Sequence, residues 1–159
     1  FDIIWNTKYK KMMLSKLGLS DENNNNFKLA EELLGLMHKH QLDYTNTFAA
    51  LSYDIEFEVS PFSHPEMQIW LGKWKTSVES STLPIVEIKE IMKQNNPVFI
   101  PRNHLIEEAL NYGVNGNMSY FMRFLEVLKT PYSFKKEHYD YLLPPDTAFE
   151  TNYQTFCGT

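Results

Sequence analysis

Apolar residues recur along most of this chain with the spacing of an α-helix, and prolines and glycines separate the repeats. The stripes are formed by Trp5, Tyr9, Met12, Met13 and Leu17; by Ala30, Leu33, Leu34 and Met37; by Ile69, Trp70 and Trp74; by Ile85, Ile88 and Met92; by Leu105, Ala109 and Leu110; and by Phe121, Phe124, Leu125 and Leu128. The sequence therefore predicts an all-α fold, a helical bundle of about seven short to medium helices.

Residues with known preferences for helix ends support this prediction. Gly18 can end the first helix in the left-handed conformation, and Asp43 can cap the N-terminus of a short third helix. Ser63 and Glu66 have the spacing of a capping box, with Pro65 in the first turn of the helix that follows.

Two segments lack the helical period. From Tyr53 to Phe62 acidic and apolar residues alternate, which fits either a short strand or an extended surface loop. From Tyr139 onward the chain has two adjacent prolines and no periodicity, which indicates an extended C-terminal tail. We therefore expect a helical domain over residues 1–138 and a tail over residues 139–159.

Composition restricts the partners of the chain. Apolar residues make up 43% of it, enough for a packed core in which Trp5, Trp70 and Trp74 are expected. The formal net charge of −5 argues against a nucleic-acid partner, which would require a basic surface. No apolar run reaches the roughly 20 residues that span a bilayer, so no membrane segment is expected.

The histidines and acidic residues lack the spacing of a metal site. His38 and His40 are two positions apart, so they point to different sides of a helix and cannot share a metal ion. Neither a metal site nor a cofactor site is expected within this chain.

The single cysteine, Cys157, lies two residues from the C-terminus. Chain ends are commonly poorly ordered, so a thiol there is better explained by its reactivity than by packing. An incidental reduced cysteine is the alternative. Because one cysteine cannot form an internal disulfide, a reducing compartment is expected.

A second candidate site is Arg102-Asn103-His104, at a predicted helix start after Pro101. One interpretation is a patch that docks on another domain. The alternative is structural: Arg102 and Asn103 would hydrogen-bond the turns around Pro97 and Pro101, a task suited to the five donors of a guanidinium group.

These motifs occur in a characteristic order, which is Asp43-Tyr44-Thr45-Asn46-Thr47-Phe48, then Asn96-Pro97-Val98-Phe99-Ile100-Pro101-Arg102-Asn103-His104, then Pro131-Tyr132, Tyr141, Pro144-Pro145 and Cys157. From about Trp5 to Thr159 the chain resembles the C-terminal part of the selenoprotein O family, kinase-like proteins that transfer AMP from ATP to protein side chains. Two positions differ from the expected pattern. Ala49 stands where a basic residue is expected, and Cys157 stands where some animal members carry selenocysteine.

The resemblance implies that residues 1–138 are the C-terminal helical domain of a larger protein adenylyltransferase. Its partner would be the upstream kinase-like domain, a pseudokinase that binds ATP and Mg²⁺ and transfers AMP to hydroxyl groups of protein substrates. This chain would brace that domain, with Arg102, Asn103 and His104 as possible docking residues. Cys157 would take part in redox chemistry with a thiol of the catalytic domain.

The chain carries no catalytic motif of its own. It has six glycines but no glycine-rich phosphate loop, and it has no H-R-D or D-F-G run. Phe1 is not an initiator methionine, which agrees with a fragment. We therefore expect an enzymatic parent protein and an inactive chain, in the cytoplasm of a bacterium or the mitochondrion of a eukaryote. The competing hypothesis is a stand-alone helical module for protein–protein interaction, with no enzymatic activity.

Overall fold

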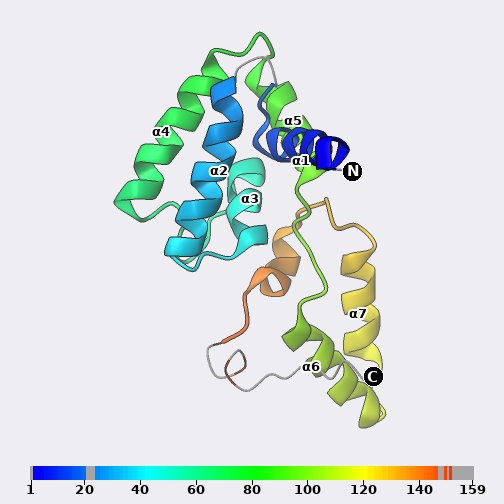
Figure 1. The fold of residues 1–159 in the computed structure, drawn as a ribbon. Coiled ribbons are helices and arrows are strands. Elements are labelled where there is room, and N and C mark those ends of the chain that lie inside the picture. The colour runs from blue at the N-terminus through cyan, green and yellow to red at the C-terminus, as the bar shows by residue number, and fades with distance from the viewer. Residues whose placement is uncertain (1, 21–23, 147–148, 150, 152–159) are drawn as a thin grey trace. The chain divides into compact units, whose positions relative to one another are not determined.

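The computed structural model of the chain describes residues 2–20, 24–146, 149 and 151 (Figure 1). Over these residues it contains seven α-helices, one 3₁₀ helix and no strand, which confirms the predicted all-α fold. The helices are α1 (Asp2–Leu17), α2 (Asn24–Lys39), α3 (Tyr44–Tyr53), α4 (Pro65–Glu79), α5 (Ile85–Asn95), α6 (Asn103–Val114), α7 (Ser119–Leu128) and the 3₁₀ helix η1 (Lys136–Leu142).

The chain forms two compact units, Phe1–Val98 and Phe99–Thr159. The division lies inside the region 1–138 that the sequence suggests as one helical domain. None of the helices in the described part of the chain is long and apolar enough to cross a membrane.

The first unit packs α1 to α5 around one apolar core, in which α5 contacts α1, α3 and α4, and α2 contacts α1 and α4. Trp70 and Trp74 are buried as predicted, and their rings stack with centroids 6.5 Å apart. Their indole nitrogens donate hydrogen bonds to the backbone oxygens of Leu29 and Leu17, each at 2.9 Å. Burial therefore leaves neither indole donor unsatisfied.

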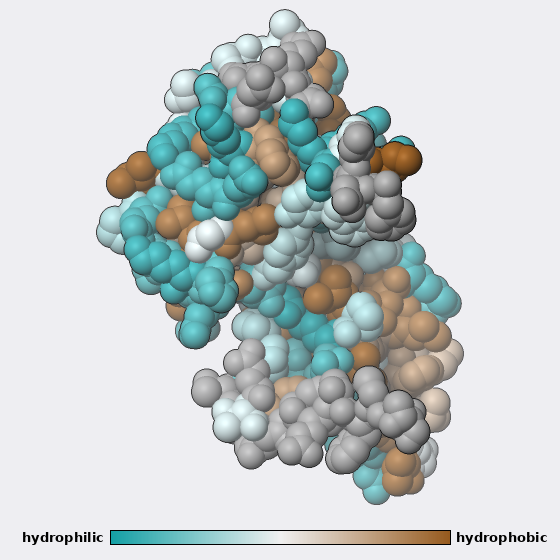
Figure 2. Space-filling model, in the orientation of Figure 1, coloured by the Kyte–Doolittle hydropathy of each residue, from teal (hydrophilic) through white to brown (hydrophobic). Residues whose placement is uncertain are grey.

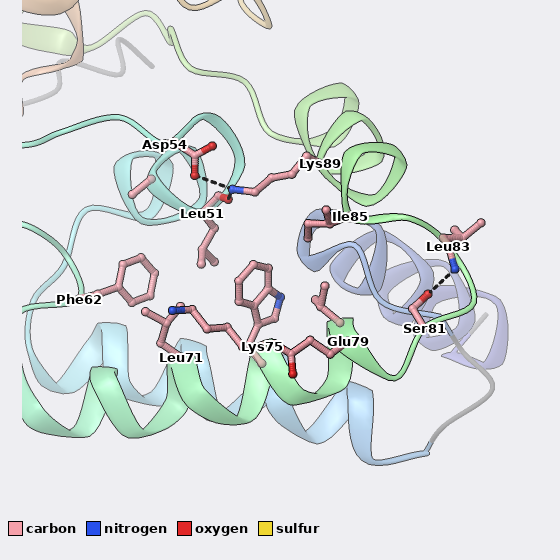
Figure 3. Close-up of a pocket in the computed structure, with 13 residues that line it drawn as sticks. Leu51, Asp54, Phe62, Leu71, Lys75, Glu79, Ser81, Leu83, Ile85 and Lys89 are labelled. Atoms are coloured by element: carbon pink, nitrogen blue, oxygen red, sulfur yellow. Dashed lines mark hydrogen bonds and ion pairs between the residues drawn. The ribbon is translucent and has the colours of Figure 1, made fainter.

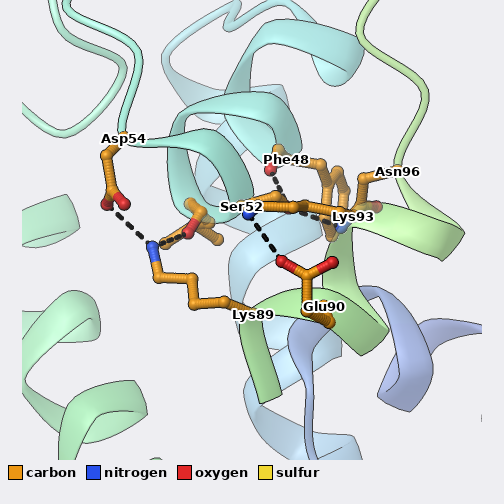
Figure 4. Close-up of polar contacts among 8 residues, drawn as sticks. Phe48, Ser52, Asp54, Lys89, Glu90, Lys93 and Asn96 are labelled. Carbon is orange, nitrogen blue, oxygen red and sulfur yellow. Dashed lines mark hydrogen bonds and ion pairs between the residues drawn. The ribbon is translucent and has the colours of Figure 1, made fainter. Parts of the chain in front are cut away.

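The buried side chain of Asn96 connects three helices at the end of α5, and Figure 4 shows it beside Ser52 of α3. Its Nδ2 donates to the backbone oxygen of Lys16 in α1 at 2.7 Å and to Ser52 Oγ in α3 at 2.8 Å. The Lys16 ammonium also donates to this helix end. Its Nζ lies 3.3 Å from Asn96 Oδ1 and 2.9 Å from the backbone oxygen of Asn95. The Asn96 amide thus fixes the positions of α1, α3 and α5 relative to one another.

Lys89 of α5 holds the C-terminal end of α3 (Figure 4). Lys89 Nζ donates to the backbone oxygen of Leu51 at 2.6 Å and pairs with Asp54 at 2.8 Å. The last carbonyls of a helix have no partner within the helix, so Lys89 supplies one of the missing donors.

Gly18 ends α1 in the left-handed conformation, as predicted, with φ +66°. Leu19 N donates to the oxygen of Leu14 and Gly18 N donates to the oxygen of Ser15, the two bonds of a Schellman cap. Asp43 also caps α3 as predicted, because Asn46 N donates to its Oδ1 at 2.8 Å.

The predicted capping box before α4 is wrong, although the proline in the first turn is present. His64, not Ser63, is the N-cap residue, and its side chain makes no capping hydrogen bond. The Glu66 carboxylate has other partners: it accepts from Lys39 Nζ at 2.7 Å and lies 2.9 Å from His40 Nε2. These hydrogen bonds lower the pKa of Glu66, and they occupy the group that the capping box requires.

The predicted faces of α1 and α4 are partly wrong. Trp5, Met12 and Ile69 were expected on the buried stripes, but they are 62%, 42% and 63% exposed. In α1 Met13 and Leu17 are buried as predicted, and Leu14, which the predicted stripe does not contain, is buried with them.

In the segment from Tyr53 to Phe62, Tyr53 ends α3 and the remaining residues form an irregular loop, the second of the two predicted alternatives. Asp54 adopts a left-handed conformation with φ 52°, which turns the chain out of α3. Ile55 is buried but Val59 is 77% exposed. The apolar residues of the alternating pattern therefore do not share one buried side, as they would in a half-buried strand. With no strand in the described residues, the segment has no ladder partner.

The second unit contains α6, α7 and η1. Leu105 and Ala109 of α6 pack with Phe124 of α7, and Tyr141 of η1 stacks on Phe124 with ring centroids 5.6 Å apart. Phe99 N donates to the oxygen of Pro131 at 3.2 Å, which joins the start of this unit to the segment after α7.

The 3₁₀ helix η1 occupies part of the segment that the sequence suggests as an extended tail. Leu142 at its end is completely buried, and extended backbone begins at Leu143 with φ −63° and ψ 133°. A 3₁₀ helix has three residues per turn, so it leaves no 3.6-residue pattern in the sequence. The rest of the predicted tail, including Cys157, lies largely outside the described residues.

Replacing Gly18 by alanine should destabilise the chain by about 2–4 kcal/mol. The new Cβ would overlap Ile88 Cγ2 and approach Met92, and the positive φ disfavours any L side chain. Gly35→Ala is the matched control: it lies in α2 with no heavy atom within 4 Å of its Cβ position. Gly35→Ala should raise the free energy of unfolding, measured in urea, by about 0.5–1 kcal/mol. Equal effects of the two substitutions would contradict the assigned cap.

Asn96→Ala should lower the free energy of unfolding by about 2–4 kcal/mol, because it leaves a buried carbonyl and a buried hydroxyl without their donor. Asn95→Ala is the control, since among the described residues the Asn95 side chain donates within α5, to the oxygen of Ile91 at 2.8 Å. It should cost under about 1 kcal/mol. A loss below that value for Asn96→Ala in the same denaturation assay would refute the connecting role of Asn96.

Candidate functional site

Arg102, Asn103 and His104 stand at the N-terminus of α6. Arg102 is the N-cap residue, and its backbone oxygen accepts from Ile106 N at 3.0 Å. Its side chain is buried, with the residue 8% exposed, whereas the neighbouring Asn103 is exposed. Burial fits a structural task for Arg102, and exposure makes Asn103 the member of this run that a docking partner could reach.

A hollow of about 410 Å³ opens beside this helix start. It is lined by Ile100, Pro101, Arg102, Asn103, His104, Pro145 and Phe149. The His104 ring meets the Phe149 ring edge-on, with centroids 5.9 Å apart. The structure thus brings the double-proline segment to the Arg102-Asn103-His104 run. Phe149 was missed by sequence reasoning because it lies in an aperiodic segment.

His104 has a partly buried ring whose Nδ1 is buried without a hydrogen-bond partner among the described residues. Burial lowers the pKa of His104, and the positive charge of Arg102 lowers it further. The carboxylates of Glu108 and Asp146 oppose this shift. The neutral imidazole is therefore the favoured form at neutral pH.

His104 also borders a larger hollow of about 990 Å³ in the second unit. There Tyr120 OH donates to Glu108 Oε2 at 2.8 Å. Burial, followed by the hydrogen bond and charge of Glu108, raises the pKa of Tyr120, so its phenol stays protonated. Arg123 and His138 are among the other residues that line the hollow.

The first unit has its own hollow of about 790 Å³, between α3, α4 and α5 (Figure 3). Phe62, Leu71 and Trp74 provide an apolar wall. Lys89 lies at the opposite side, held by Asp54 and the backbone of Leu51. Sequence reasoning missed this hollow because its residues come from separate elements and form no motif.

The predicted redox residue, Cys157, lies outside the described residues, so the structure does not place it. Within the part of the chain that is described, no group of three or more His, Cys, Asp or Glu side chains is arranged to hold a metal ion.

Comparison with known proteins identifies relatives of the whole chain. Three of them are named protein nucleotidyltransferase YdiU, from Clostridium perfringens strain 13, Anoxybacillus flavithermus and Bacillus cereus strain AH820. They are 39%, 38% and 37% identical to this chain. The alignments cover 95%, 100% and 100% of this chain but only 31%, 32% and 33% of the relatives. The chain therefore spans about a third of the length of these curated relatives.

A family model gives the same result and confirms the resemblance to selenoprotein O. The model described as protein adenylyltransferase SelO matches residues 1–129, which is more than half of the chain. This chain belongs to the SelO family of protein adenylyltransferases.

Proposed function

We propose that this chain is the C-terminal helical domain of a longer protein adenylyltransferase. The observation that carries the proposal is the extent of the match, because nearly all of this chain corresponds to only about a third of its relatives. The sequence has no glycine-rich phosphate loop and no H-R-D or D-F-G run. The chemistry is accordingly assigned to the part of the protein outside this chain.

In that reaction a protein hydroxyl attacks the α-phosphorus of ATP. A phosphodiester bond forms between that oxygen and AMP, the bond to the β-phosphate breaks, and pyrophosphate leaves with the electron pair, while a base outside this chain takes the hydroxyl proton. A kinase-like domain would bind ATP with Mg²⁺, and the metal would neutralise charge on the phosphates. No step of this chemistry is assigned to a residue of the present chain.

The contribution of this chain would be to brace the kinase-like domain. The first unit suits this task because the buried side chains of Trp70, Trp74 and Asn96 hydrogen-bond to the backbone of neighbouring helices. Arg102, Asn103 and His104 are proposed as docking residues, with Asn103 the exposed one. The protein would act in the bacterial cytoplasm, or in the mitochondrion of a eukaryote.

The proposal predicts different behaviour for the full-length protein and for this chain alone. With Mg²⁺ and ATP labelled on the α-phosphorus, the full-length protein should transfer label to a protein, whereas the chain alone should transfer none. Calorimetry should detect no ATP binding to the chain alone, because it lacks a phosphate-binding motif. Tight stoichiometric binding would place the nucleotide site in this region. A reading frame that encodes nothing upstream of Phe1 would instead support the stand-alone interaction module.

Cys157 is proposed to regulate transfer by forming a disulfide with a thiol of the catalytic domain. A disulfide reagent such as oxidised glutathione would accept the two electrons and leave as two molecules of reduced glutathione. In the full-length protein, Cys157→Ser should abolish the change in AMP transfer caused by oxidised glutathione and by reductant. ATP affinity should be unchanged, since the tail is proposed to act from outside the nucleotide site. A serine variant that keeps the wild-type redox response would show that Cys157 has no regulatory role.

A further inference from the structure

The helix α7 has two apolar faces. Its inner face contributes Phe124 and Val127, which are buried. A second stripe is formed by Met118, just before the helix, and by Phe121, Met122 and Leu125. These positions follow the i, i+3, i+4, i+7 spacing, so they lie on one side of the helix.

This second stripe, which we call the outer stripe, is exposed in the chain. Met118 and Met122 are each 51% exposed, and Phe121 and Leu125 are 37% and 38% exposed. Figure 2 shows apolar surface gathered over α7. Single exposed apolar residues are ordinary on protein surfaces, but four in one stripe indicate a surface that is covered in the working protein.

The size of the outer stripe distinguishes between possible occupants. The exposed fractions correspond to roughly 350 Å² of apolar surface, about half of what one partner of a stable dimer buries. A segment of the same polypeptide needs less area, because the covalent connection gives it a high effective concentration. The relatives are about three times as long as this chain, so such a segment is available in them.

We propose that the outer stripe of α7 is a docking surface for the remainder of the polypeptide, the kinase-like part outside this chain. The inference rests on the proposed function, since it requires that longer protein. It also names the chemistry of the contact: an apolar surface of the catalytic part covers Met118, Phe121, Met122 and Leu125.

Methionine oxidation tests this surface directly, because the rate of sulfoxide formation with hydrogen peroxide follows exposure of the sulfur. In the native full-length protein, Met118 and Met122 should oxidise at least about tenfold more slowly than in the denatured protein. In the chain alone they should oxidise within about threefold of the denatured rate. Met67 and Met92, both fully buried in the folded chain, give the protected reference within each native sample.

Three results would overturn the proposal. Rapid oxidation of both residues in the full-length protein would show that the stripe is uncovered. Equal protection in the chain alone would show that the chain covers its own stripe. Protection that rises with protein concentration would identify a second copy as the occupant.

Met122→Lys provides an independent test, with Asn111→Lys on the exposed surface of α6 as a control for the added charge. In the full-length protein the first variant should restore rapid oxidation of Met118, and the control should not. The chain alone should tolerate both. AMP transfer measured on the same samples separates the two proposals: protection without transfer refutes only the proposed activity, and transfer without protection refutes only the docking surface.

Discussion

The hydrogen bonds around Asn96 are the constraint on which the first unit depends. Pro97 requires α5 to stop, which leaves the last carbonyls of that helix without partners in the helix. Donors from other helices replace them: Lys16 Nζ of α1 reaches the oxygen of Asn95, and Tyr53 OH of α3 reaches the oxygens of Lys93 and Asn96. The Asn96 amide binds both helices in return. Hydrogen bonds at the C-terminal end of α5 thereby join α1, α3 and α5.

Local chemistry made most of the fold predictable from the sequence. Gly18 and Asp43 act at helix ends through their own backbone and side-chain properties, so their roles could be assigned without knowing the tertiary structure. The role of Glu66 could not be assigned in this way. Whether its carboxylate caps the start of α4 or binds Lys39 and His40 depends on how α2 lies against α4.

The same distinction applies to the candidate site. Arg102 and His104 were identified from sequence, but the contact of His104 with Phe149 depends on how the chain returns after α7. The outer stripe of α7 illustrates a further limit, because periodicity identifies apolar positions but does not say which of them are buried. We propose that the remainder of a longer polypeptide covers this stripe, which would explain why its apolar residues are exposed in this chain.

We propose that this helical region braces a catalytic domain from outside the nucleotide site. The most direct measurement is the temperature at which the full-length Asn96→Ala variant loses AMP transfer, together with its ATP affinity at a lower temperature where it is folded. We expect inactivation several degrees below wild type, since the substitution removes about 2–4 kcal/mol of stability from this helical region. ATP affinity should be unchanged. An unchanged inactivation temperature, or a loss of ATP affinity in the folded variant, would contradict it.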